Sequence, residues 1–344
     1  MRPLSPFNRR FVLKSRPVDL PGRENFEIEE VPHPALGADE VRVRVAYVAL
    51  SPWQGQRLKD FRNYTRPFEI GELIDCDILG EIIEVGAGVS DMTRIGHLVT
   101  ARLGWQEYAV AKPHEMVAVS NEFSPTLWLT ALSSPGLTAY CAMDLFGRPM
   151  PGQTMVVTSA AGSVGSYAVQ LGKLAGMHVV GVAGGADKCR HVTEKLGADA
   201  CVDHRGMTFG RDLAAGLSDG AHLVFDTVGG PIADAVFDNL AKYARVLIVG
   251  RTASNNSDRP DLDPINMRQL WAREASVKGF SRYSYPERWS FARERMQALC
   301  RRGLIRSQHN EVVGFEMTPD ALRGMLSGQF TGKVLVRYGE VASS

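Results

Sequence analysis

Residues 155–165 read Met155-Val156-Val157-Thr158-Ser159-Ala160-Ala161-Gly162-Ser163-Val164-Gly165. The first four residues are typical of a short buried strand, and the apolar residues from Val164 onward recur at helical spacing. A glycine-rich turn between a strand and a helix is the fingerprint of a dinucleotide site, with Ala160 here in the place of the first glycine. We therefore predict that Gly162 lets the backbone approach a pyrophosphate and that Gly165 lets the helix pack on the sheet.

The alternation of strand and helix continues after this turn. Further strands are predicted at His178–Val182, Ala200–Val202, Leu223–Phe225, Val246–Val249 and near Val277–Phe280, with helical stretches between them. This spacing predicts a doubly wound parallel sheet, the Rossmann fold. The polar segment Arg251–Asp263 predicts a loop.

Both ends of the chain follow a different pattern. Phe26–Val31 and Val41–Val45 alternate apolar with polar residues, as half-buried strands do, and Lys333–Val336 is again β-like. We predict a β-barrel or sandwich domain over residues 1–126, completed by residues 307–344. The Rossmann domain is predicted at residues 127–306.

Composition excludes several classes of protein. The 344 residues are 44% hydrophobic, which is enough for two domains with a core each. With 39 basic and 38 acidic residues, the chain lacks the field that attracts nucleic acid or a membrane surface. The five cysteines have neither metal-binding nor redox spacing, and no secretory signal or long apolar span is present, so we expect a cytoplasmic protein.

The end of the second predicted strand indicates which dinucleotide is bound. An NAD site usually places Asp or Glu there, but this chain reads Val182-Ala183-Gly184-Gly185-Ala186-Asp187-Lys188. Lys188, with Arg190 as a second cation, would attract a 2′-phosphate. The alternative interpretation is that Lys188 is an ordinary solvated helix residue and Asp187 an N-terminal helix residue.

Several motifs together resemble one family. They are Ser134-Pro135-Gly136-Leu137-Thr138-Ala139-Tyr140, the turn at Ala160–Gly165, Gly184-Gly185-Ala186-Asp187-Lys188-Cys189 and Phe225-Asp226-Thr227-Val228-Gly229-Gly230. The chain resembles the zinc-independent medium-chain dehydrogenases/reductases from about Phe11 through Val336. More narrowly, it is similar to the alkenal/one oxidoreductase branch, which includes leukotriene B4 dehydrogenase/prostaglandin reductases and curcumin-reductase-like proteins.

The resemblance implies a GroES-like barrel built from both chain ends, and NADPH-dependent reduction of the carbon–carbon double bond of an α,β-unsaturated ketone or aldehyde. It places the pyrophosphate at Gly162, Ser163 and Val164, and the 2′-phosphate at Lys188. Other cofactor-binding positions that it implies are Thr138, Gly184, Arg205, Val228 and Gly250. It also implies a homodimer, with Rossmann sheets joined edge to edge near Val246–Val249 or through the following segment. The apolar strand is equally consistent with burial inside one subunit.

Zinc ligands are not predicted. The place where a zinc alcohol dehydrogenase carries its first cysteine reads Ser51-Pro52-Trp53-Gln54. His97 and His114 have no cysteine nearby in the sequence, whereas catalytic zinc needs Cys and His ligands with one open position. We therefore expect no metal.

Without a metal, a side chain or the cofactor itself must stabilise the enolate oxygen that forms in conjugate reduction. A tyrosine hydroxyl donates without being ionised near neutral pH. Tyr283 and Tyr285 match a family segment beside the substrate, and Tyr64 matches a second pocket tyrosine. The alternative is that each of them packs its ring and exposes its hydroxyl.

The chain also departs from the family pattern. Trp53 lies where relatives carry the tyrosine of Asp-Pro-Tyr-Met-Arg, His204 replaces a tyrosine, and Phe330 replaces an asparagine. These departures leave substrate choice open. Quinone reduction, enoyl reduction and, in a different class, an NADPH-binding protein without turnover therefore remain alternatives.

Overall fold

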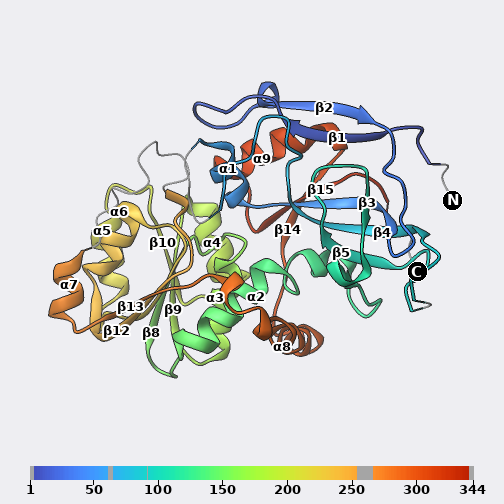
Figure 1. Cartoon of the computed structure of the whole chain (residues 1–344). Helices are drawn as coiled ribbons and strands as arrows, with labels where there is room; N and C mark the ends of the chain where they lie inside the picture. The colour runs from blue at the N-terminus through green and yellow to red at the C-terminus, as the bar shows by residue number, and fades with distance from the viewer. Residues whose placement is uncertain (1–3, 61–64, 91, 254–265, 341–344) are drawn as a thin grey trace. The chain divides into compact units, whose positions relative to one another are not determined.

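Two compact units make up the computed structural model of the chain, which describes residues 4–60, 65–90, 92–253 and 266–340 (Figure 1). The first unit combines Met1–Leu129 with His309–Ser344, and the second is Thr130–Gln308. No helix among the described residues is long and apolar enough to cross a membrane.

The first unit is a β-domain. Its larger sheet has the strand order β14-β15-β3-β4-β5-β7, with β6 also paired to β3, while β1 and β2 form an antiparallel pair. The strands are β1 Asn8–Leu13, β2 Phe26–Val31, β3 Val41–Leu50, β4 Asp77–Val85, β5 Leu98–Arg102, β6 Tyr108–Ala111, β7 Val117–Ala118, β14 His309–Val313 and β15 Lys333–Arg337. In β15, Val336 lies opposite Val48 of β3, so the carboxyl-terminal segment completes the amino-terminal sheet, as predicted.

A mainly apolar core holds this unit together. The ring of Phe11 stacks on Phe315 with 4.7 Å between centroids and meets Trp105 edge-on at 5.9 Å. Phe11 and Trp105 come from the amino-terminal part and Phe315 from the carboxyl-terminal part, so burial of these rings ties the two segments together. The α-helices of the unit are α1 Pro52–Leu58 and α9 Thr318–Leu326.

The second unit contains the predicted parallel sheet, with the strand order β10-β9-β8-β11-β12-β13. Its strands are β8 Thr154–Thr158, β9 His178–Ala183, β10 Ala200–Asp203, β11 Ala221–Asp226, β12 Leu240–Ile248 and β13 Ser276–Gly279. Val156 of β8 pairs with Val180 on one side and Val224 on the other, so β8 is central. The strand order reverses at β8, which is the mark of a doubly wound sheet.

Helices cover both faces of this sheet. They are α2 Ser134–Ala142, α3 Gly165–Leu174, α4 Ala186–Glu194, α5 Phe209–Gly216, α6 Gly230–Phe237, α7 Met267–Ala272 and α8 Trp289–Arg301. Right-handed crossovers place α3 and α4 on one face and α5 and α6 on the other (Figure 1). Leu213 of α5 and Val236 of α6 are fully buried against the sheet.

The structure distinguishes the two interpretations that the apolar run Val246–Val249 allowed, a sheet edge that joins two copies or burial inside one subunit. Val246 pairs with Val224 of β11 on one side and with Val277 of β13 on the other. This run is apolar because β12 is an interior strand. The outer strand is β13, and the predicted loop beyond Ala253 lies outside the described residues.

Candidate active site

The carboxyl ends of the parallel strands form one edge of the second unit, and ligands of such sheets bind where the strand order reverses. That point lies between β8 and β11. Thr158 Oγ1 at the end of β8 donates a 2.6 Å hydrogen bond to Asp226 Oδ1 at the end of β11. The two strand ends, 68 residues apart in sequence, are thereby joined at the switch point.

The turn after β8 is shaped by close backbone contacts. Ser159 adopts a left-handed φ of 48°, and its carbonyl oxygen accepts from the Gly162 N–H at 2.8 Å. A Cβ on Gly165 would lie only 2.3 Å from that same oxygen. Only glycine therefore fits at the first residue of α3, and it brings the helix directly onto the turn.

This turn presents backbone donors. Within the described residues of this unit, no group accepts from the N–H of Val164 or Gly165, as is usual in the first turn of a helix. Ser163 is part of the same half-buried turn. Donors and the positive end of a helix dipole together suit a pyrophosphate. Ala160 is fully buried beneath the turn. Its Cβ is so close to Gly181 of β9 that a Cβ added to Gly181 would lie only 2.9 Å away.

A basic cluster lies at the end of β9. A Cβ on Gly184 would be 2.8 Å from His204 Nε2 and 2.9 Å from Arg205 Nε, so both side chains pack on this glycine. Lys188 follows on α4, where burial and then the charge of Arg205 lower its pKa. We call Lys188, His204 and Arg205 the basic cluster. His204 replaces a tyrosine of the family pattern, and nothing in the sequence indicated that it would join this cluster.

The carboxylate beside this cluster is already engaged. Asp203 Oδ1 accepts from the backbone N–H of Gly185 at 2.8 Å and of Arg205 at 2.9 Å. These two hydrogen bonds lower the pKa of Asp203 and keep it ionised. Asp203 therefore shapes the loop that carries the cluster, and three basic side chains fit a phosphate monoester better than ribose hydroxyls.

A buried acid organises the opposite side of the edge. Asp226 accepts from the N–H of Val228 at 3.0 Å and of Gly229 at 3.1 Å, while burial raises its pKa against these hydrogen bonds. Gly250 N donates to the Asp226 carbonyl at 3.3 Å, so Val228 and Gly250 lie together. Asp226 lies in the motif Phe225–Gly230, but the motif alone does not indicate that its carboxylate binds backbone N–H groups.

Arg251 and Thr138 also belong to the second unit. Arg251 follows Gly250, and its Cζ lies 3.4 Å from where a Cβ on Gly229 would be, which places a cation at the same edge. Its position at the end of a predicted strand was the signal that could have identified it. Thr138 is half-buried on α2 and has no side-chain hydrogen bond among the described residues.

The tyrosine segment follows β13. The ring of Tyr285 lies parallel to Phe280 at 5.6 Å and edge-on to Phe146 at the same distance. Within the described residues its hydroxyl makes no hydrogen bond. Tyr283 is 45% exposed, and its hydroxyl lies 3.4 Å from an Arg282 nitrogen. Tyr64 lies outside the described residues.

The departures in the first unit have structural partners. The ring of Trp53 is flanked by the guanidinium groups of Arg102, at 4.6 Å, and Arg57, at 5.8 Å. Ser51 Oγ accepts from the buried Lys333 Nζ at 2.6 Å. Phe330 packs on α9, where a Cβ on Gly324 would meet its ring at 2.8 Å. These side chains therefore support the fold of this unit.

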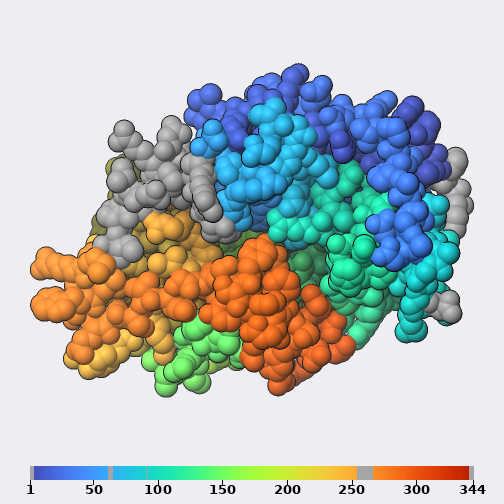
Figure 2. All heavy atoms as spheres, viewed as in Figure 1, coloured from blue at the N-terminus to red at the C-terminus, as the bar shows by residue number. Residues whose placement is uncertain are grey.

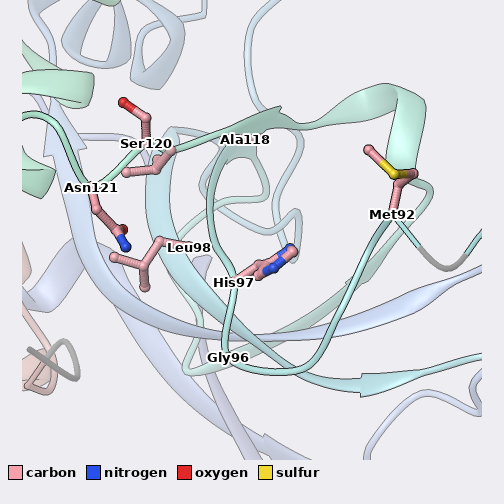
Figure 3. A pocket seen from close by; sticks show the side chains of 8 residues that line it. Met92, Gly96, His97, Leu98, Ala118, Ser120 and Asn121 are labelled. Carbon is pink, nitrogen blue, oxygen red and sulfur yellow. The ribbon is translucent and has the colours of Figure 1, made fainter. Parts of the chain in front are cut away.

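No group of three or more His, Cys, Asp or Glu side chains that could hold a metal occurs in the part of the chain that the structure describes. His97 lines a surface hollow of about 370 Å³ with Met92, Gly96, Leu98, Ala118, Val119, Ser120 and Asn121 (Figure 3). None of these residues is a cysteine or an acid. His114 lies in the short helix Pro113–Glu115 and is exposed.

Comparison with known families matches both parts of the chain. The family described as the N-terminal domain of oxidoreductase matches residues 9–119, and the one described as zinc-binding dehydrogenase matches residues 163–298.

Individual relatives span nearly the whole chain. The NADPH-dependent curcumin reductase of Escherichia coli is 34% identical over 96% of each chain, and the 2-alkenal reductase (NADP(+)-dependent) of Nicotiana tabacum is 27% identical over 96% of this chain and 97% of its own. Among solved structures, CurA from Vibrio vulnificus in complex with NADPH has a TM-score of 0.90 and 32% identity, covering 96% of this chain and 99% of its own. The chain belongs to the medium-chain dehydrogenase/reductase family, in the zinc-independent branch that contains the curcumin, alkenal and prostaglandin reductases.

Proposed function

We propose that this protein uses NADPH to reduce the carbon–carbon double bond of α,β-unsaturated ketones and aldehydes. The observation that carries the proposal is the carboxyl edge of the parallel sheet, which combines a donor-rich glycine turn with the basic cluster. The named activities of the curcumin and alkenal reductases support the same reaction.

The residues at this edge suit each part of the cofactor. Gly162, Ser163 and Val164 would hold the pyrophosphate with backbone N–H groups, and Lys188 and Arg205 would bind the 2′-phosphate. Val228 and Gly250 would lie along the nicotinamide half, with Thr138 from α2. We assign the second unit to the cofactor.

NADPH, when bound, supplies a hydride to the β-carbon of the substrate. The protein must then stabilise the negative charge that develops on the carbonyl oxygen. Tyr285 is the best candidate for that donor, because Phe280 and Phe146 fix its ring while its hydroxyl has no hydrogen bond among the described residues. Tyr283 is more exposed, with its hydroxyl next to Arg282.

Turnover with a substrate panel tests the function directly. With NADPH deuterated at the transferred position, we expect enones and enals to be reduced and the label to appear at the β-carbon, as read by mass spectrometry and NMR. Saturated ketones serve as the control. Oxidation of NADPH by quinones alone would favour quinone reduction instead, and tight binding without any reduction would favour a protein that does not turn over.

The choice of cofactor depends on Lys188. For Lys188→Ala we expect NADPH to bind about ten- to a hundredfold more weakly, which corresponds to the loss of one charge-assisted phosphate contact. Binding of NADH should stay nearly unchanged, because NADH lacks that phosphate. Fluorescence titration measures both constants. Lys195→Ala, an exposed lysine after the same helix, is the matched control, and equal weakening of both cofactors would contradict the assignment.

Loss of the donor hydroxyl should affect turnover more than substrate affinity. For Tyr285→Phe we expect kcat to fall about ten- to a thousandfold with a smaller change in KM, because the hydrogen bond strengthens as charge develops. Tyr283→Phe and Tyr64→Phe should have milder effects. Tyr243→Phe, whose ring is 63% exposed on β12, is the control. Wild-type turnover in the triple Phe variant at positions 64, 283 and 285 would show that the three are packing residues.

We also propose a homodimer formed through β13. The residues of this outer strand are exposed, and an edge strand offers unpaired backbone groups to a second copy. Apolar side chains accompany it, with Trp271 81% and Met267 67% exposed. Figure 2 shows the orange segment after residue 265 at the surface.

Light scattering should therefore give twice the chain mass of 37.7 kDa. Trp271→Glu should shift the mass toward the monomer, because it places a charge in the apolar patch. Met207→Glu, at another fully exposed position, should leave the mass unchanged. A monomer in the wild-type protein would refute the dimer.

We further propose a cytoplasmic location, since the five cysteines are all free thiols.

A further inference from the structure

The imidazole of His204 lies among the other two side chains of the basic cluster. Its Nε2 and the Arg205 guanidinium both lie against Gly184, at the end of β9. Lys188, on α4, is close enough for its charge to act on both His204 and Arg205. Two basic side chains therefore pack on one glycine, which has no side chain to separate them from a ligand, and the charge of Lys188 acts on both.

The charged groups around His204 are unbalanced. Arg205 and Lys188 are cations, and the acid facing the imidazole is Asp203. The Asp203 carboxylate already accepts two backbone N–H groups, which limits its capacity to pair with an imidazolium. On the outer side of α4, Asp187 and Arg190 pair with each other at 3.2 Å.

These surroundings favour the neutral imidazole of His204 over the imidazolium in the free protein. Burial, followed by the charge of Arg205, lowers the pKa of His204 below its usual value. Two neighbouring cations and partial removal from water act in the same direction. A bound dianion would reverse this balance, because it offers the imidazolium both opposite charge and a hydrogen-bond acceptor.

We propose that His204 is a specificity-determining residue that takes up a proton from solvent when a 2′-phosphorylated nucleotide binds. The imidazolium then donates a hydrogen bond to the phosphate beside Lys188 and Arg205. This inference rests on the proposed use of NADPH. Its consequence is that preference for NADPH over NADH falls as the pH rises, because the added contact requires a protonated ring.

The direction of the pH dependence follows from linkage. Binding of the phosphate raises the pKa of His204, so the extra affinity is fully present below the pKa of the free protein. It is lost as the pH rises through the pKa of the complex. The phosphate monoester titrates near pH 6 and tends to lose its own proton on binding, which opposes this effect. Comparison of the wild type with His204→Gln separates proton uptake by His204 from proton loss by the phosphate.

Calorimetry with adenosine 2′,5′-bisphosphate, and with 5′-AMP as the control lacking the 2′-phosphate, tests the proposal without any turnover. Titrations at pH 7.5 in buffers of different ionisation enthalpy count the protons taken up. When the bisphosphate binds, we expect the wild type to take up about 0.3 to 0.8 proton more than His204→Gln does. When 5′-AMP binds, the two proteins should take up the same number of protons. Between pH 6.5 and 8.5 the wild-type Kd should rise about three- to tenfold more than that of the variant.

A second variant guards against a local folding defect. His204→Lys carries a charge that does not titrate in this range, so its Kd should be low and nearly independent of pH. His178→Gln, at the start of β9, should behave as the wild type. Equal proton uptake by the wild type and His204→Gln would overturn the role of His204 while leaving NADPH use intact. Binding of 5′-AMP without tighter binding of the bisphosphate would instead refute the NADPH assignment and the inference with it.

Discussion

The close approach of the backbone at the start of α3 is the constraint on which the cofactor site depends. The carbonyl of Ser159 occupies the space that a side chain on Gly165 would need, with only 2.3 Å to a Cβ there. This contact places the first turn of the helix at the end of β8. The N–H groups of that turn then face the sheet edge as donors, and the left-handed conformation of Ser159 completes the turn.

Two carboxylates organise the loops on either side of this turn, and both do so by binding backbone N–H groups. Asp203 orders the loop that carries the basic cluster, and Asp226 orders the turn at Val228 and Gly229. The Asp226 carboxylate is buried and would be costly without such partners, whereas Asp203 is only partly buried. In both loops these hydrogen bonds hold the backbone in place. Neither carboxylate is therefore free to accept hydrogen bonds from ribose hydroxyls, which agrees with a site for a nucleotide that carries a 2′-phosphate.

The sequence predicted the sheet and its turn because both depend on local patterns. The strands and the helix after Gly162 follow from apolar spacing, which neighbouring residues along the chain supply. The sequence left the place of β12 in the sheet open, because an apolar run has the same appearance inside a sheet and at an interface. Only the pairing of Val246 with both Val224 and Val277 distinguishes these cases.

The sequence by itself determined the parallel sheet, the dinucleotide turn and the absence of an acidic residue directly at the end of β9. The tertiary structure decided which charges meet and which tyrosine is held. His204 is 20 positions from Gly184 in number yet packs on it, and Tyr285 is held by Phe146 from a distant segment. Such contacts depend on how strands and loops assemble in space, which spacing along one segment does not encode.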